Sequence, residues 1–411
     1  MSTPATKSGA TIPLSVMMFL EYVVWGAWLP LLGLYLATTL GFTGTQAAWI
    51  FATPAVASVF ALFVGGQIAD RYLAGEKVIL ICHAVCGLLM LAMGQQTAFV
   101  PFLVLMLVYQ LFYVPTLSVT NSIAFHNLAG QEREFGRVRL WGTIGWIAAS
   151  WPYVILLDGK TPEETKAALS SIFVVSGVAS LALAAFSFAL PKTPPQKTSE
   201  AAAPLKALKL LAVPAFAVLF VVTLMDAMVH QAYFQFTGSF LSRAGLAERW
   251  IPAAMSIGQI AEIATMAGLA FFLKRLGWRK IMVFGILGHA ARFFVFAVGD
   301  PLSLMIAVNV LHGFCYAFFF ASVYIFVDEY FPRDSRASAQ GLFNLLILGM
   351  GPFIGALAWG ELADRFTVGG AVDFHKLFLF PAGLAVAAAA LLLVAFHPKE
   401  QGSAQPERSA A

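Results

Sequence analysis

Long apolar segments alternate with short polar ones along nearly the whole chain. A helix needs about 20 mostly apolar residues to cross the hydrocarbon of a bilayer. Glycine, proline and charged residues mark off twelve segments of roughly this length or longer, which are 12–38, 46–69, 78–96, 99–127, 137–157, 167–190, 212–242, 249–273, 280–298, 302–328, 337–362 and 372–396. The pattern predicts an all-α integral membrane protein with twelve transmembrane helices.

One polar stretch interrupts the series after the sixth segment. It begins at residue 191 with PKTPPQKTSEAAAPLKALKL, which is rich in proline, lysine and alanine. A central linker between two six-helix halves resembles the major facilitator fold. We therefore expect two pseudo-symmetric halves, and the predicted division is an N-terminal half at 1–190, a cytoplasmic linker at 191–211, a C-terminal half at 212–398 and a cytoplasmic tail at 399–411.

Composition supports the membrane assignment and excludes several function classes. Hydrophobic residues make up 60% of the chain and charged residues only 11%, with a mean hydropathy of +0.81; soluble proteins have about 25% charged residues. The basic residues are spread over short loops and form no stripe for nucleic acid. No Walker motif, catalytic triad or CxxC pair occurs. We therefore expect neither an enzyme nor a cofactor, and transport driven by a gradient.

The placement of lysine and arginine predicts the orientation in the membrane. Of the 25 basic residues, 17 fall on the side of the linker, 6 on the other side and 2 within segments. Cytoplasmic loops carry the excess of positive charge. Both termini are therefore expected in the cytoplasm.

The loop after the second segment, GGQIADRYLAGEKVIL, resembles the loop motif of the major facilitator superfamily. Asp70 and Arg71 occupy the expected places, and we expect them to form a charge latch that breaks when the halves rock. The corresponding loop of the second half, FFLKRLGWRKIMVF, has Lys274 in place of the acid.

Ionisable side chains inside the apolar segments are the candidate functional residues, because each is costly in a bilayer. Glu21 is followed by Trp25 and Trp28 at i+4 and i+7, which places all three on one helix face. The spacing favours a cavity-lining role for Glu21. The alternative is an acid that reaches the interface within an aromatic belt.

Arg139, Thr143 and Trp146 follow the same spacing in the fifth segment. A bidentate donor, a hydroxyl and an indole therefore share one stripe. Spacing alone leaves two interpretations open. The stripe faces a cavity, or Arg139 ends the helix on the cytoplasmic side and pairs with Glu132 or Glu134.

Amides and a carboxylate gather with aromatic residues in the second half. Gln231 and Gln235 flank Phe234, and Gln259 lies one turn before Glu262. Amides donate and accept hydrogen bonds, and aromatic faces stack on planar rings. The group suits a polar, ring-bearing solute, whereas the alternative is hydrogen bonding between helices.

Asp226 and His230 are also spaced i, i+4 and are expected to pair, so that His230 titrates near neutral pH. The remaining intramembrane histidines, His83, His289 and His312, are isolated in the sequence. We interpret them as structural.

Several longer stretches resemble the nucleoside:proton symporter family of the major facilitator superfamily. They are WGAWLPLLGLYL, YVPTLSVTNSIAF, RLWGTIGW, SIGQIAE, ARFFVFAVGDP and RASAQGLF. The resemblance implies uptake of nucleosides across a bacterial inner membrane, coupled to proton entry. It also implies that the nucleoside is held by Arg139, Thr143, Gln231, Gln259 and Glu262.

The chain departs from its relatives in this family at three positions. Phe234 replaces an asparagine, Ala317 replaces an aspartate, and Glu21 replaces a glutamine. A lost carboxylate in one half and a gained one in the other suggest that Glu21 or Glu262 carries the proton, with Arg139 as charge partner. Asp226 is a third candidate.

These observations predict a monomeric, proton-coupled nucleoside importer of the bacterial inner membrane. Its partners are a small-molecule substrate, protons and the lipid bilayer. The alternative is a carrier of the same fold for another small polar solute, such as a sugar, a modified nucleoside or a drug, working as importer or exporter.

Overall fold

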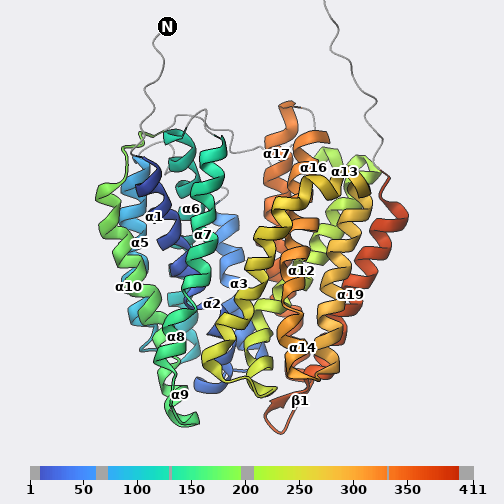
Figure 1. Cartoon of the computed structure of the whole chain (residues 1–411). Helices are drawn as coiled ribbons and strands as arrows, with labels where there is room; N and C mark the ends of the chain where they lie inside the picture. The colour runs from blue at the N-terminus through green and yellow to red at the C-terminus, as the bar shows by residue number, and fades with distance from the viewer. Residues whose placement is uncertain (1–9, 62–72, 129–131, 196–207, 331–332, 398–411) are drawn as a thin grey trace, which may run out of the picture.

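The computed structural model describes residues 10–61, 73–128, 132–195, 208–330 and 333–397, and these residues are almost entirely helical. In the first half the elements are α1 (Thr11–Gly26), α2 (Leu29–Leu34), η1 (Tyr35–Thr39), α3 (Gly44–Phe60), α5 (Gly75–Met93), α6 (Phe99–Asn127), α7 (Glu132–Ala148), α8 (Trp151–Leu156), α9 (Pro162–Ala168), α10 (Ser171–Phe186) and η3 (Ser187–Ala189). They form one of two bundles that lie side by side (Figure 1).

The second bundle repeats this arrangement. Its elements are η4 (Leu208–Ala212), α12 (Pro214–Arg243), η5 (Glu248–Trp250), α13 (Ile251–Val298), α14 (Leu302–Ala307), α15 (Val310–Cys315), η6 (Tyr316–Ala321), α16 (Ser322–Tyr330), α17 (Arg333–Asn344), η7 (Leu345–Met350), α18 (Gly351–Arg365), β1 (Thr367–Val368), β2 (Ala371–Val372) and α19 (Phe374–Ala395). The two short strands pair in an antiparallel hairpin, with Thr367 opposite Val372.

The molecule has two opposite edges, which can be followed in Figure 1. The terminal edge is where α1 begins and α19 ends. The hairpin edge, at the opposite end of the bundles, carries β1 and β2. Both ends of the described chain therefore lie on one side, as an even number of crossings requires.

Nine helical stretches of the described residues are long and apolar enough to cross a membrane. One of them, Glu248–Val298, has 51 residues and would be about 75 Å long as a straight helix, far more than one crossing needs. It breaks at Gly277, whose φ of 72° and ψ of 166° are not helical, and the chain turns back there (Figure 1). The all-helical, multi-pass fold is confirmed, whereas the count of twelve crossings stays a prediction.

The two halves close against each other at the hairpin edge. The carboxylate of Asp364, at the end of α18, accepts from the backbone N–H groups of Gly44 and Thr45 at 2.5 and 2.8 Å. These N–H groups begin α3 of the other half, where a helix attracts negative charge. An ion pair between Arg249 and Asp158 is a second contact between the halves. The hairpin edge is therefore shut in this conformation.

Glycine lets the halves approach closely just inside this edge. A side-chain carbon at Gly238 of α12 would lie 2.6 Å from the carbonyl oxygen of Pro30 in α2. Because only glycine fits there, the backbones of α2 and α12 come together. Leu29 and Leu32 of the same α2 segment line the space described next.

Candidate functional site

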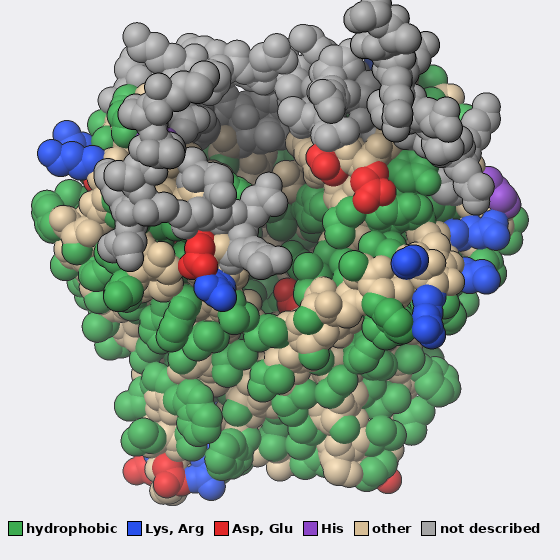
Figure 2. Space-filling view, turned by 45° about the horizontal axis from the view of Figure 1, so that its top comes forward, with side chains coloured by type: hydrophobic (Ala, Val, Ile, Leu, Met, Phe, Trp, Pro, Cys, Tyr) green, Lys and Arg blue, Asp and Glu red, His purple; other side chains and the backbone are tan. Residues whose placement is uncertain are grey.

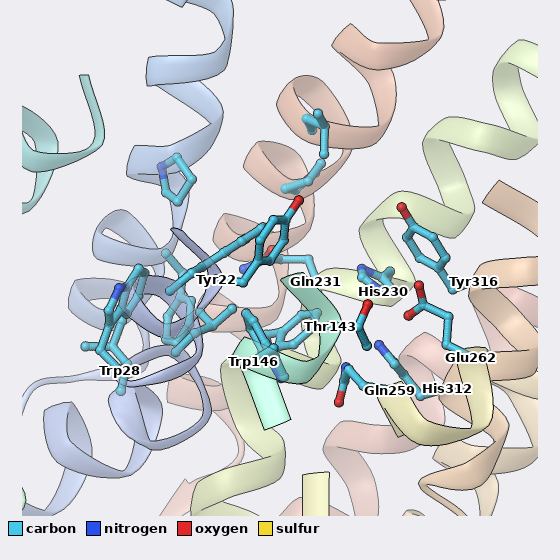
Figure 3. A pocket seen from close by; sticks show the side chains of 18 of the residues that line it. Tyr22, Trp28, Thr143, Trp146, His230, Gln231, Gln259, Glu262, His312 and Tyr316 are labelled. Carbon is cyan, nitrogen blue, oxygen red and sulfur yellow. The ribbon is translucent and has the colours of Figure 1, made fainter. Parts of the chain in front are cut away.

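A cavity of about 250 Å³ lies between the halves, near the lower end of the range for small-molecule sites. Figure 2 shows the molecule hollowed between its halves on the terminal edge. The side chains that line the cavity come from both bundles and point into a common space (Figure 3). They are Tyr22, Trp25, Trp28, Leu29, Leu32, Ile50, Phe51, Pro54, Arg139, Thr143, Trp146, His230, Gln231, Phe234, Gln259, Glu262, His312, Tyr316, Leu348 and Pro352.

Arg139, Thr143 and Trp146 of α7 lie together in the cavity wall, where their spacing predicts a common stripe. The guanidinium of Arg139 stacks over the ring of Tyr22, 4.4 Å from its centroid, in a cation–π contact. Arg137 instead is exposed and bonds to Glu134 at 2.6 Å. The geometry favours the cavity interpretation of Arg139 over a cap.

Aromatic rings from both halves form a continuous wall. The ring centroids of Trp25 and Trp146 are 5.5 Å apart, and those of Trp146 and Phe234 are 6.2 Å apart, both edge to face. The ring centroid of Phe234 lies 5.2 Å from that of His230 and 5.5 Å from that of His312. A planar ring entering the cavity would meet indole, phenyl and imidazole faces at once.

Polar groups of the second half complete the site. Gln231 of α12 and Gln259 and Glu262 of α13 all line the cavity. Gln235 does not, because its amide donates to the carbonyl of Ala356 at 3.3 Å. Glu262 is the single carboxylate among the lining residues of the described chain, and the same lining includes the guanidinium of Arg139.

The prediction that Glu21 lines the cavity is wrong. Its carboxylate is fully buried within the first half, 2.9 Å from His83 Nε2 and 2.7 Å from the hydroxyl of Thr116. Residues three and four positions before Trp25 both share its helix face. The rotation of α1 places Tyr22, and not Glu21, beside Trp25 in the cavity.

The expected pairing of Asp226 with His230 is also wrong. Asp226 Oδ1 lies 2.8 Å from Nδ1 of His289. His230 instead lines the cavity and stacks on His312, with 5.1 Å between ring centroids. His289 and His312, interpreted from the sequence as isolated, therefore form one cluster with His230.

Two further predictions concern the loop motif and Ala317. Asp70 and Arg71, the expected latch, lie outside the described residues. Ala317, one of the departures from the family pattern, is buried and does not line the cavity, whereas its neighbour Tyr316 does.

Sequence reasoning missed Tyr22, His230, His312 and Tyr316 as cavity residues. All four are aromatic or heteroaromatic: Tyr22 adjoins Glu21 and Tyr316 adjoins Ala317, whereas His230 and His312 were assigned other roles. Spacing could not identify them, since the helix rotations decide which of two neighbouring side chains faces the cavity.

Comparison with known proteins identifies the family. The family model described as "Nucleoside H+ symporter" matches residues 9–401. The chain is 31% identical over 405 residues to xanthosine permease of Escherichia coli (strain K12), covering 93% of this chain and 95% of the relative. It is 29% identical over 413 residues to nucleoside permease NupG of the same organism, covering 94% and 96%.

Solved structures agree. The crystal structure of nucleoside transporter NupG superposes with a TM-score of 0.85 at 27% sequence identity, covering 95% of this chain and 100% of that one. The predicted membership and the major facilitator fold are confirmed. This chain belongs to the nucleoside H+ symporter family, a family of membrane transporters and not of enzymes.

Proposed function

We propose that this chain takes up nucleosides together with protons, and that the nucleoside binds in the cavity between the halves. One observation carries the proposal: Arg139 and Thr143 of one half face Gln231, Gln259 and Glu262 of the other across a single cavity. The family model supports the substrate class and the proton coupling.

The lining suggests how a nucleoside would lie. A base has a planar face with donors and acceptors at its edge, and a ribose has several hydroxyl groups. Trp146 and Phe234 offer faces for the base, and the amides of Gln231 and Gln259 offer donors and acceptors for its edge. A carboxylate such as Glu262 accepts from hydroxyl groups.

The predicted orientation of the chain in the membrane supports an inward-open state of the transporter. If the terminal edge is cytoplasmic, as the excess of basic residues there predicts, the hollow opens to the cytoplasm and the hairpin edge closes the periplasmic side. Alternating access would then rock the halves, 1–190 and 212–398, about the bound solute, with the linker 191–211 joining them. A single chain holds both halves, which favours a monomer.

Two of the three predicted proton carriers keep a direct link to the cavity. Glu262 lines the cavity itself, and Asp226 contacts His289, whose ring centroid lies 5.7 Å from that of the cavity-lining His230. Glu21 is enclosed in the first half. We therefore retain Glu262 and Asp226 as candidates.

Uptake by proteoliposomes tests the proposal. Purified chain would be reconstituted and given radiolabelled uridine, adenosine or xanthosine, with an inward proton gradient and with or without an uncoupler. We expect accumulation of at least one nucleoside that the uncoupler abolishes. A bound nucleoside should also raise the melting temperature of the detergent-purified protein by mass action.

Two results would contradict the proposal. Absence of uptake and of any thermal shift with all three nucleosides would favour a different polar solute. Accumulation only when the gradient is reversed would favour an exporter.

A further inference from the structure

Each half contains one buried carboxylate–histidine pair at the corresponding place. In the first half Glu21 lies on the first membrane helix, α1, and His83 on the third, α5. In the second half Asp226 lies on the first, α12, and His289 on the third, after the break in α13. All four side chains are fully buried, and the contacts are 2.9 and 2.8 Å long.

The pair in the first half is closed by hydrogen bonds on every side. The hydroxyl of Ser180 donates to the carbonyl of His83 at 2.9 Å, so its oxygen accepts from His83 Nδ1–H at 3.0 Å. His83 Nε2 contacts Glu21 Oε2, and the hydroxyl oxygen of Thr116 lies 2.7 Å from Glu21 Oε1 and 2.6 Å from the carbonyl oxygen of Tyr113. Every side-chain nitrogen and oxygen of this pair therefore has a hydrogen-bond partner.

The pair in the second half is open. Asp226 Oδ2 and His289 Nε2 are buried and make no hydrogen bond to nitrogen or oxygen in the described part of the chain. The thiol of Cys315, which is only a weak donor and acceptor, adjoins His289. Buried polar atoms without partners are rare in folded proteins. The unpartnered nitrogen of His289 is therefore a place where a proton can be added.

His230 connects this open pair to the cavity. Its ring centroid lies 5.7 Å from that of His289, and its own Nε2 is also buried without a partner among the described residues. His230 is also one of the side chains that line the cavity. An imidazole that touches both the cavity and the pair can take a proton from one and give it to the other.

A hydrogen bond from Arg292 prevents His312 from passing a proton between the cavity and the pair. Arg292 Nη1 lies 3.0 Å from His312 Nδ1, and arginine can only donate. His312 Nδ1 must therefore accept, which keeps the ring neutral with its hydrogen on Nε2. Arg292 also places a fixed positive charge one helical turn from His289, which balances an ionised Asp226.

We propose that the Asp226–His289 pair, reached from the cavity through His230, holds the proton that is carried with the nucleoside. The added proton occupies His289 Nε2 while Nδ1–H stays bonded to Asp226, so the pair changes from a charge of −1 to zero. With Arg292 counted, the cluster changes from zero to +1. Burial opposes the added charge, and the neighbouring carboxylate of Asp226 favours it.

Other ionisable groups adjoin the cluster and enter any pH dependence. From the four packed elements they are Asp226, His230 and Tyr233 on α12, Glu262, His289 and Arg292 on α13, His312 and Cys315 on α15, and Tyr316 at the start of η6. Tyr233 donates to Asn309 at 2.9 Å. Glu262 is the competing carboxylate, and the test below separates it from the pair.

The test compares proton-driven accumulation with exchange of labelled for unlabelled nucleoside at equal pH. It rests on the proposed function, but exchange by the unsubstituted protein tests that function separately. His289→Asn keeps an amide nitrogen at the place of Nδ1, and Asp226→Asn removes the charge. A gradient of about one pH unit drives about tenfold accumulation with one proton per nucleoside.

We expect both variants to retain exchange and to lose accumulation, so that the inside-to-outside ratio falls to about one. The matched variants Glu21→Gln and His83→Gln should accumulate as the unsubstituted protein does. Normal accumulation by His289→Asn would overturn the proposal. So would loss of accumulation with intact exchange in Glu262→Gln, if the two variants of the pair still accumulate.

Discussion

The two halves place the same pair of side chains at the same point and surround it differently. Glu21 and His83 are enclosed by hydrogen bonds from Thr116 and Ser180. Asp226 Oδ2 and His289 Nε2 make no hydrogen bond to nitrogen or oxygen among the described residues, and the neighbouring His230 lines the cavity. An acid–histidine contact therefore says little about its role until the partners of its remaining atoms are known.

The comparison also separates stability from transport. A fully hydrogen-bonded buried pair fixes helices against one another, and removing one partner leaves an uncompensated polar group. A pair with unbonded atoms holds its two helices less rigidly, and its free imidazole nitrogen can accept a proton. The predictions below test this division, starting with the largest expected effect.

Glu21→Ala should destabilise the protein by about 3–5 kcal/mol, because His83 and Thr116 lose their partner in a buried site. Glu21→Gln should cost much less, since an amide still bonds to imidazole. Denaturant titration of the detergent-solubilised protein measures the free energy of unfolding of both variants. The exposed Glu163, whose pair with Lys166 is 3.5 Å long, provides the control, and its substitution by alanine should change stability by less than about 0.5 kcal/mol. Equal costs for Glu21→Ala and Glu163→Ala would refute the closed-pair interpretation.

Arg139→Ala should reduce nucleoside uptake by about 10- to 100-fold, the size expected for one lost hydrogen bond to a charged group. Arg137→Ala, two residues away, should leave uptake within about twofold, because an exposed ion pair contributes little. Initial uptake rates in proteoliposomes measure both. Similar losses in the two variants would show that the first half contributes no charge to the substrate site.

Asp364→Asn should shift the equilibrium toward opening of the hairpin edge by about fivefold. The charge at the start of α3 is worth about 1 kcal/mol, and it acts across the interface between the halves. A cysteine introduced at Leu348, labelled by an impermeant reagent from that side in a cysteine-free background, reports the opening. Glu361→Gln, which alters an ion pair within α18, is the control. An unchanged labelling rate in Asp364→Asn would place the closing contact elsewhere.

Much of this site could be predicted where its residues share one helix. Arg139, Thr143 and Trp146 lie on one stripe of α7 because the helical period alone brings them together. Gln259 and Glu262 of α13 were found for the same reason, whereas spacing paired Gln231 with Gln235, which does not line the cavity. Prediction failed where the rotation of a helix decided between neighbours, as with Glu21 and Tyr22.

The sequence by itself determined the membrane solvent, the helical fold, the division into halves and the family, since these depend on composition, period and motif. Only the tertiary structure decided that Asp226 meets His289, 63 residues away, and that Glu21 turns from the cavity toward His83. Pairing between helices depends on how each helix rotates and packs. Intramembrane polar groups bond to whichever partner that packing brings within reach, and local spacing does not encode it.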